Sequence, residues 1–296
     1  MSEPVVRRPA RAVVRAAAEQ LAQVGVESPE YDAAELLAHV LGTTRASLVL
    51  VDDVPMTAIA AFDTLLQRRL AREPLQHLTG VAHFRHVELA VGPGVFVPRP
   101  ETEVLAGWAI DALREAHAAG VAEPVAVDLC SGSGAIARSL VDEVPAARVH
   151  AVELSAAAYA WAERNLAGTG VDLRQGDFAT AFDDLLGTVD VVVCNPPYIP
   201  LEAWESVAAE ARDHDPHEAL FSGQDGLDAI RVLERRAARL LRPGGVVGVE
   251  HADVQGPDGT GGGAPAVFSA TGRWADVRDH DDLAGRPRFT TARLAR

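Results

Sequence analysis

The sequence predicts an α/β protein in which a small helical domain is joined by a β-hairpin to a mostly parallel sheet. Three observations carry this prediction. Residues 1–80 show only helical patterns, residues 84–97 alternate between apolar and polar side chains, and strand–helix alternation begins at Pro124. Alternating strands and helices favour a parallel sheet covered on both faces. With 296 residues, nearly half of them apolar, the chain is long enough for two domains.

Residues 1–82 are expected to form the helical domain. The stretch "RAVVRAAAEQLAQVG" ends at Gly25, and its apolar residues lie at helical spacing: Val13, Val14, Ala17, Leu21 and Val24. A second helix begins with Ser28 as its N-cap and Pro29 at its first position, and stops at Gly42. A third covers residues 56–73 and ends before Pro74. This domain is either a mere appendage or, as its position ahead of the second domain suggests, a unit that docks that domain's substrate; we expect the latter.

Residues 83–100 are expected to be the hairpin that links the two domains. The stretch "FRHVELAVGPGVFV" alternates, and Gly92-Pro93-Gly94 is typical of a turn. The sequence therefore predicts that the hairpin turns at these three residues.

The second domain is expected to span residues 101–296. Short runs rich in β-branched residues predict five strands at residues 125–130, 148–154, 171–175, 189–194 and 246–251. Helical stretches at 155–168 and 226–241 separate some of them. Residues 272–282 and 288–294 have only a turn between them, so we expect an antiparallel pair. Five glycines within residues 255–265 predict a mobile loop there rather than a regular helix.

Charge and composition exclude several functions. The formal net charge is −15, and residues 1–90 hold nine Arg against eleven Asp or Glu, so most of the acidic excess follows residue 90. Sequence-independent nucleic-acid binding needs basic surface, which argues against that function. Two cysteines are too few for a disulfide framework or a zinc site, and no His, Cys or acidic cluster has metal-ligand spacing. Without a signal peptide or a long apolar run, we expect a cytoplasmic protein.

A glycine-rich loop follows the first predicted strand of the second domain. Gly132, Gly134 and Ala137 fit the pattern G-x-G-x-x-A, which dehydrogenases, flavoproteins and methyltransferases share. A tight strand–helix turn without a ligand is the alternative. Glu153 ends the second strand, where a carboxylate can accept hydrogen bonds from both ribose hydroxyls of an adenosine.

Two further acids favour S-adenosylmethionine over a nicotinamide dinucleotide. Asp128 lies at the end of the first strand, where it would meet the amino group of S-adenosylmethionine but repel a pyrophosphate. Asp177 and Phe178 follow the third strand, and we expect them to accept from the adenine amino group and to pack on its ring. The alternative for Asp177 is a turn residue or helix cap.

The segment Asn195-Pro196-Pro197-Tyr198 ends the fourth strand, which in the usual strand order neighbours the first. An amide or aromatic amine nitrogen is a poor nucleophile, because its lone pair is delocalised. Asn195 offers a side-chain carbonyl and Pro196 a backbone carbonyl to hold its N–H groups, while Tyr198 offers a flat face. The prolines stiffen this platform. The alternative is a proline-rich turn that only stops the strand.

With both loops identified, the sequence resembles the HemK/PrmC family of protein-(glutamine-N5) methyltransferases. The resemblance covers most of the chain. The motifs that carry it are "FVPRPETE" at 96–103, "DLCSGSGAIA" at 128–137, "CNPPYIP" at 194–200, "HEALFSGQDGLDAIR" at 217–231 and "DLAGRPRF" at 282–289. The Asn-Pro-Pro-Tyr motif alone is shared with DNA adenine methyltransferases, whereas the first and last of these motifs are narrower.

The resemblance implies a Rossmann-like class I S-adenosylmethionine-dependent methyltransferase sheet behind the helical domain. It implies methyl transfer to the glutamine of the Gly-Gly-Gln motif in class I peptide chain release factors. The resemblance implies that the cofactor loop is Cys130, Ser131, Gly132, Ser133 and Gly134, that the ribose acid is Glu153 and that Phe178 packs beside the adenine. With Asp128, Asp177 and Asn195, these are the cofactor-binding residues that we expect, and the expected catalytic residues are Asn195, Pro196 and Tyr198. Asn195, Pro196, Pro197 and Tyr198 would hold the glutamine, and no metal is implied. Cys130 departs from the family's usual glycine, Phe178 from its usual tryptophan, and the glycine-rich stretch around Gly261 from its usual helix.

Other interpretations stay open. Arg99, Glu101 and Glu103 either wall the substrate pocket or form a salt-bridged exit from the hairpin that caps the next helix. The closest rival function is glutamine methylation of a ribosomal protein, followed by adenine-N6 methylation of DNA, which the acidic surface disfavours. A nicotinamide dehydrogenase leaves the Asn-Pro-Pro-Tyr segment unexplained, and a non-enzymatic binding module ranks last. We expect a monomer with no membrane contact and no direct nucleic-acid binding.

Overall fold

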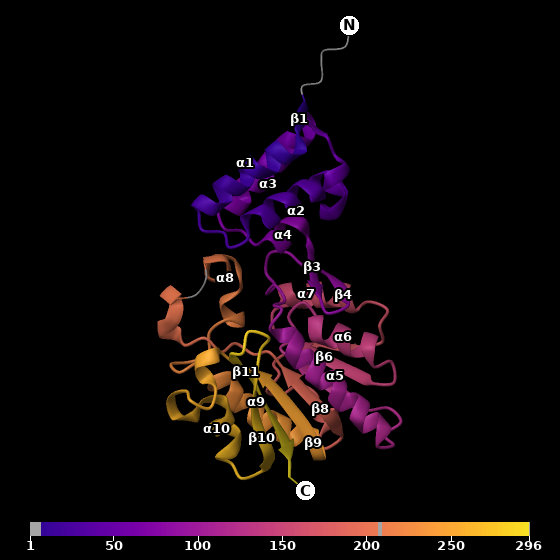
Figure 1. Ribbon diagram of the computed structural model, residues 1–296. Helices are drawn as coiled ribbons and strands as arrows, with labels where there is room; N and C mark the ends of the chain where they lie inside the picture. Colours follow the sequence, from indigo (N-terminus) through magenta and orange to yellow (C-terminus); the bar gives the residue numbers. More distant parts are fainter. Residues whose placement is uncertain (1–6, 207–208, 296) are drawn as a thin grey trace. The chain divides into compact units, whose positions relative to one another are not determined.

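The computed structural model describes residues 7–206 and 209–295, and the chain forms two compact units (Figure 1). The first unit consists of the described residues of Met1–Val81 together with those of Ala208–His214. The second consists of the described residues of Ala82–Val207 and Asp215–Arg296. Each unit has its own hydrophobic core. Among the described residues, no helix combines the length and the apolar character needed to cross a bilayer.

The first unit is a helical bundle with a two-stranded ribbon. Its elements are β1 (Arg7–Pro9), α1 (Ala10–Gln23), α2 (Pro29–Val40), β2 (Asp53–Pro55), α3 (Met56–Leu70), α4 (Leu75–Thr79) and α8 (Ala209–His214). Ser28 precedes α2 and Pro29 begins it, although the Ser28 side chain makes no capping hydrogen bond. The buried face of α1 includes Leu21 but not Val24, which is 42 % exposed because α1 has already ended at Gln23. The pairing of β1 with β2 was not predicted.

Helix α8 belongs to the first unit, although it follows the sheet's fourth parallel strand in sequence. The Arg69 guanidinium donates through Nε to Asp32 Oδ2 at 2.7 Å and through Nη2 to Glu210 Oε1 at 2.6 Å. Arg72 adds an ion pair to Glu210 at 3.1 Å. Because the Arg69 side chain is only 6 % exposed, its charge depends on these carboxylates.

The second unit is built on a seven-stranded sheet with the order β10-β11-β9-β8-β5-β6-β7. Its strands are β5 (Val125–Leu129), β6 (Arg148–Glu153), β7 (Asp172–Gln175), β8 (Val189–Cys194), β9 (Leu241–Glu250), β10 (Trp274–Asp281) and β11 (Pro287–Leu294). Strands β5 to β9 are parallel, and β8 lies beside β5 as predicted. The predicted antiparallel pair β10–β11 is confirmed, and β11 also pairs antiparallel with β9.

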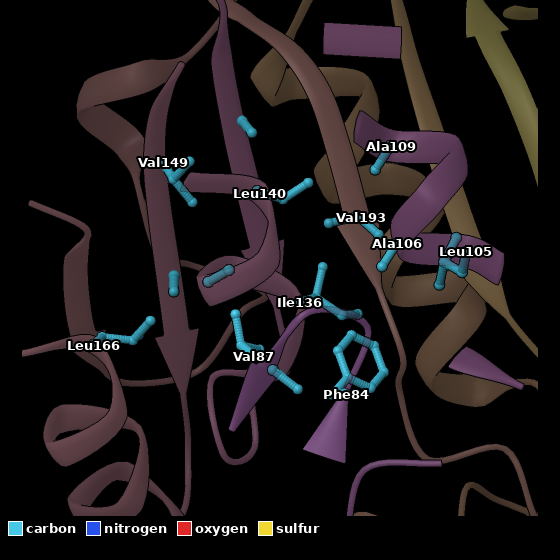
Figure 2. Packing of buried hydrophobic residues seen from close by; sticks show 14 of the residues in the cluster. Phe84, Val87, Leu105, Ala106, Ala109, Ile136, Leu140, Val149, Leu166 and Val193 are labelled. Atoms are coloured by element: carbon cyan, nitrogen blue, oxygen red, sulfur yellow. The ribbon is translucent and has the colours of Figure 1, made fainter. Parts of the chain in front are cut away.

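Helices cover both faces of this sheet, and the buried residues of the two faces pack in two separate hydrophobic cores. On one face lie α5 (Thr102–Ala118), α6 (Ala135–Glu143) and α7 (Ala156–Leu166); on the other lie α9 (Asp228–Leu240) and α10 (Gly263–Ser269). Figure 2 shows the first core, where Ile136 of α6 lies near Phe84 and Val87, and Ala106 of α5 lies near Val193 of β8. The neighbouring residues Val192 and Cys194 pack in the other core.

The hairpin predicted for residues 83–100 turns earlier than expected. Strands β3 (Val81–Phe84) and β4 (Val87–Ala90) are joined by Arg85 and His86, and Arg85 adopts a positive φ of 52°. The chain does turn at Gly92–Gly94, where the Val95 N–H donates to the Gly92 carbonyl at 3.4 Å, but the prediction that this turn joins the two strands of the hairpin is wrong. Gly92 serves close packing instead: a Cβ there would lie 2.6 Å from the Trp161 ring.

The expectation of an irregular loop over residues 255–265 is also partly wrong. Residues Thr260–Gly262 form a 3-10 turn and Gly263 begins α10. Glycines 261, 262 and 263 all have positive φ, which glycine adopts without a steric penalty. A Cβ at Gly263 would clash with the Gln255 carbonyl, so the close approach needs glycine. Buried Ala264 and Phe268 then anchor the helix in the core.

Candidate functional site

A largely apolar cavity of about 420 Å³ lies at the carboxyl ends of β5, β6, β7 and β8. This is where open α/β sheets bind ligands. Ten of the residues expected from the sequence line it: Cys130, Ser131, Gly132, Ser133, Glu153, Asp177, Phe178, Asn195, Pro197 and Tyr198. The other four, Asp128, Gly134, Pro196 and Arg99, do not belong to its wall.

The glycine loop between β5 and α6 is folded tightly. The Ser131 N–H donates to the Val152 carbonyl at 3.0 Å, and the Gly134 N–H donates to the Ser131 carbonyl at 2.8 Å. Gly132 and Gly134 have positive φ, and so does Cys130, at 66°. A side chain in this left-handed region is strained, whereas glycine adopts it without that strain. Gly134 lies against Leu166 rather than on the cavity wall.

Asp128 lies behind the cavity wall, and its expected contact with the amino group of a ligand stays a prediction. Its carboxylate is fully buried, and Oδ2 accepts from the Ser131 hydroxyl at 3.0 Å and from the Ala137 N–H at 3.1 Å. Its other oxygen has no hydrogen-bond partner among the described residues. Burial raises the pKa of Asp128 to about 7, and the charge of Glu153 adds to the rise, while the two hydrogen bonds oppose it. Asp128 therefore braces the glycine loop from beneath.

Glu153 joins the glycine loop to the end of β6. Its Oε2 accepts from the Gly132 N–H and its Oε1 from the Ser155 N–H, both at 2.8 Å. Burial raises the pKa of Glu153, although these backbone N–H groups oppose the rise. Each oxygen keeps a further lone pair, and the side chain lines the cavity, so it can accept hydrogen bonds from a diol.

Asp177 and Phe178 follow β7 on the same wall. The Asp177 Oδ1 accepts from the Ala179 N–H at 2.8 Å, which is the turn role that the sequence left open. Its other carboxylate oxygen is not used in that bond. Phe178 packs against the core that lies under α9 and α10, so its ring is held from behind.

The segment from Asn195 to Tyr198 forms the side of the cavity that follows β8. The Asn195 Nδ2 donates to the Thr102 Oγ1 at 3.1 Å, and the Tyr198 hydroxyl donates to the Glu250 Oε1 at 3.2 Å. Pro196 is buried next to the wall, and its carbonyl belongs to the same rigid segment. Burial and the Glu250 charge raise the pKa of Tyr198, so this hydroxyl stays protonated.

Several residues that hold this segment were not identified from the sequence. Gln255 donates through Nε2 to the Tyr198 carbonyl at 2.9 Å and to the Asp225 carbonyl at 3.0 Å. The Ile199 N–H donates to the Leu220 carbonyl at 2.8 Å, which aligns the "HEALFSG" stretch with the loop. Ala219 and Leu220 from this stretch line the cavity, as does Pro216 just before it. For Ala219 and Leu220, membership in the motif at 217–231 was the signal that could have identified them.

Arg99, Glu101 and Glu103 of the "PRPETE" stretch do not line the cavity. Arg99 pairs with Asp215 at 3.2 Å and lies over the Phe96 ring at 5.0 Å, off the cavity wall. Glu103 lies in the first turn of α5, where an acid favours the helix dipole. Phe96, Pro98 and Thr102 are the residues of this region that do line the cavity.

The two cysteines lie next to each other at the sheet's carboxyl edge. Leu129 pairs with Cys194 in register, and Cys130 follows Leu129. Both thiols are free, and Cys130 lines the cavity whereas Cys194 is buried. Burial, and then the neighbouring Cys130, raise the pKa of Cys194.

The fold and the site define a class I methyltransferase. Residues 126–214 match a family described as a methyltransferase domain. The catalytic domain of hMettl16, solved in complex with the MAT2A 3′UTR hairpin 6, has a similar fold, with a TM-score of 0.52 and 13 % identity over 70 % of this chain and 75 % of that chain.

Sequence relatives identify the family. Residues 12–80 match the PrmC N-terminal domain. The release factor glutamine methyltransferase of Streptomyces coelicolor is 60 % identical over 284 residues, which cover 96 % of this chain and 98 % of that protein. The chain therefore belongs to the family of release factor glutamine methyltransferases. A 4-amino-L-phenylalanine/4-methylamino-L-phenylalanine methyltransferase of Streptomyces pristinaespiralis is 49 % identical over 71 % of this chain and 70 % of that protein.

Proposed function

We propose that this enzyme transfers a methyl group from S-adenosylmethionine to the side-chain nitrogen (N5) of the glutamine in the Gly-Gly-Gln motif of class I peptide chain release factors. One observation carries the proposal: the Asn195–Tyr198 segment and the glycine loop line one cavity, so an acceptor for amide N–H groups faces the site of the methyl donor. The 60 % identity to a release factor glutamine methyltransferase supports the choice of substrate.

The residues of the cavity fit S-adenosylmethionine. Glu153, Asp177 and Phe178 line the cavity, and in this proposal Glu153 accepts from the ribose hydroxyls while Phe178 and Asp177 contact the adenine ring and its amino group. The glycine loop offers backbone to the remainder of the ligand. The buried carboxylates of Asp128 and Glu153 favour a cationic ligand over an anionic one, because no described cation pairs with either. A pyrophosphate would meet unfavourable charge here.

The residues after β8 prepare the acceptor nitrogen. The Asn195 side-chain carbonyl and the Pro196 backbone carbonyl hold the two N–H groups of the glutamine amide, which turns the nitrogen lone pair toward the methyl group. When bound, S-adenosylmethionine supplies a methyl group on a positively charged sulfur, which departs as a neutral thioether as the N–CH₃ bond forms. The methylated nitrogen then loses a proton to water, so no strong base is required. Positioning of this kind lowers a barrier by roughly 7–11 kcal/mol in favourable cases.

The partner in this proposal is a protein. The helical N-terminal domain then docks the release factor, Asn195, Pro196, Pro197 and Tyr198 receive the glutamine, and the reaction takes place in the cytoplasm. Glutamine methylation of a ribosomal protein and adenine-N6 methylation of DNA use the same chemistry, so they serve as comparison substrates.

The test uses methyl-labelled S-adenosylmethionine with a purified release factor, ribosomes and DNA in separate reactions. We expect label on the release factor alone, and peptide mass spectrometry should place it on the Gly-Gly-Gln glutamine. A release factor with glutamine replaced by asparagine is the matched control and should take up no label. Label on ribosomal protein or DNA, with none on the release factor, would overturn the proposal.

A second candidate substrate is a free aromatic amine. The relative from Streptomyces pristinaespiralis favours it, because its name assigns N-methylation of 4-amino-L-phenylalanine to a protein 49 % identical over 71 % of this chain. An aromatic amine, like an amide, has a planar nitrogen with two N–H groups. Incubation with 4-amino-L-phenylalanine decides: turnover faster than on the release factor would favour this candidate.

A further inference from the structure

A polar network lies directly behind the Asn195 side chain, where three elements meet. Thr102 is the first residue of α5 and lines the cavity, Asn195 follows β8, and Glu250 ends β9. Thr102 is 4 % exposed and Glu250 is 1 % exposed. Glu250 does not belong to the cavity wall, so it acts on the site only through its neighbours.

The two ends of an asparagine amide have nearly the same shape but opposite hydrogen-bonding character. Only the carbonyl end of Asn195 can accept the N–H of a glutamine amide. In this structure the NH₂ end donates to the Thr102 hydroxyl at 3.1 Å, which leaves the carbonyl end for the cavity. A threonine hydroxyl can accept or donate, however, so it fixes this orientation only when its own proton is committed elsewhere.

The Glu250 carboxylate is the acceptor for the Thr102 hydroxyl proton. An ionised carboxylate accepts and never donates. The Tyr198 hydroxyl donates to its Oε1 at 3.2 Å, whereas Oε2 is buried without a hydrogen bond among the described residues. The Thr102 hydroxyl lies beside this carboxylate and stabilises its ionised form. A hydrogen bond from the Thr102 hydroxyl to this carboxylate would leave the Thr102 lone pairs for the Asn195 NH₂ group.

We propose that Thr102 and Glu250 are positioning residues that set the direction of the Asn195 amide, so that its carbonyl and not its NH₂ group faces the acceptor nitrogen. The same carboxylate holds Tyr198, so both polar side chains of the acceptor platform depend on it. This inference rests on the proposed function, because the direction of the Asn195 amide matters to catalysis only if the enzyme methylates an amide nitrogen.

The charge state of Glu250 makes the inference measurable. Burial raises its pKa to about 7, and the nearby Glu101 adds to the rise, whereas Thr102, Arg288 and Tyr198 oppose it. When Glu250 is protonated it can donate to the Thr102 oxygen, and the hydroxyl is then free to donate to the Asn195 carbonyl. The methylation rate should therefore rise with pH through the neutral range as the carboxylate forms.

The experiment compares Thr102→Val, Thr102→Ser and Glu250→Gln in the full chain with release factor as substrate. Valine keeps the shape of threonine and removes the hydroxyl, whereas serine keeps the hydroxyl. We expect Thr102→Val to lower kcat roughly tenfold to hundredfold, as a misplaced reacting group does, with S-adenosylmethionine affinity unchanged. Thr102→Ser should restore most of kcat. Glu250→Gln should lower kcat and remove the rising limb of the pH profile.

Thr291→Val is the matched control for the loss of a buried hydroxyl, because Thr291 is 6 % exposed and bonds His280 on the sheet's edge pair. Its kcat and pH profile should equal those of the unaltered enzyme. The inference is overturned if Thr102→Val retains full kcat, if serine fails to rescue, or if Glu250→Gln keeps the rising limb. An unaltered enzyme that labels no release factor would instead refute the proposed function.

Discussion

Replacing Asp128 with asparagine should stabilise the ligand-free protein above neutral pH. The Asp128 carboxylate is fully buried and one of its oxygens has no hydrogen bond among the described residues, so its ionised form is costly. Burial raises its pKa from 3.8 to about 7. For an acid with a raised folded-state pKa, the folded state binds the proton more tightly than the unfolded state does. The contribution to stability is therefore full below pH 3.8 and is lost as the pH rises through 7.

The expected change in the free energy of unfolding follows from the pKa shift of Asp128. Roughly three pKa units at about 1.4 kcal/mol each set a ceiling of about 4 kcal/mol on the stability lost between pH 4 and pH 8. Asparagine carries no charge at any pH, and its carbonyl oxygen still accepts from the Ala137 N–H or the Ser131 hydroxyl. We expect the other of these two hydrogen bonds to weaken, at a cost of roughly 1 kcal/mol. At pH 8 the free energy of unfolding of Asp128→Asn should thus exceed that of the unaltered protein by roughly 1–3 kcal/mol. At pH 4 the variant should be equal or slightly less stable.

Denaturant unfolding without ligand at pH 4 and pH 8 measures this difference. Asp190→Asn is the control, because buried Asp190 accepts from the Val125 N–H at 2.7 Å and from the Arg242 Nε at 2.5 Å. That variant leaves a guanidinium without its carboxylate and should destabilise the protein at pH 8. Titration calorimetry should also show weaker S-adenosylmethionine binding by Asp128→Asn, as negative charge beneath the glycine loop is lost. A stability difference that does not change with pH would refute the reasoning.

Four further predictions concern the cavity and the helical domain. Glu153→Ala should weaken S-adenosylmethionine binding by roughly 1–3 kcal/mol, because charge-assisted hydrogen bonds to the ribose and the brace on the glycine loop are lost; calorimetry measures this, and unchanged affinity would exclude the assigned role. Asn195→Ala should lower kcat about a hundredfold or more while cofactor affinity stays nearly constant, and affinity that falls in step with activity would contradict it. Bound S-adenosylmethionine should protect Cys130, but not the buried Cys194, from thiol reagents; equal labelling rates with and without cofactor, with activity retained, would remove Cys130 from the site. Deletion of residues 1–80 should leave cofactor binding intact and slow methylation of the intact release factor, whereas full activity would exclude a docking role.

Much of the sheet could be predicted because strands such as β5 and β8 are short runs rich in valine with sharp ends. Strand β8 begins at Val189 and ends at Cys194 as the sequence predicted, since Asn195-Pro196 stops the apolar run. The hairpin was misplaced because a Gly-Pro-Gly sequence was taken as its turn, while the residues that turn, Arg85 and His86, carry no turn signal. The need for glycine at Gly92 arises from Trp161, which is distant in sequence.

The cavity wall was largely predictable, and the residues behind it were not. Glycine spacing and strand ends identify the loop residues directly, because each lies within a local motif. Thr102 and Glu250 meet only when α5 and β9 pack beside β8, and nothing in either segment indicates that contact. Asp128 was identified but its partners were not, because a strand-end position does not reveal that its carboxylate accepts from Ser131 and Ala137 beneath the loop.

Because helix α8 belongs to the helical unit but follows β8 in sequence, the helical unit cannot be completed early in synthesis. The helical unit of residues up to Val81 leaves the ribosome long before Glu210, the carboxylate that joins Asp32 around the buried Arg69. Until then Arg69 keeps only one of its two acidic partners, and Arg72 lacks Glu210 altogether. The nascent helical unit is therefore incomplete until β5 to β8 have been translated. Pulse proteolysis of ribosome-bound chains of increasing length should detect a step in the protection of the helical unit when Glu210 leaves the exit tunnel.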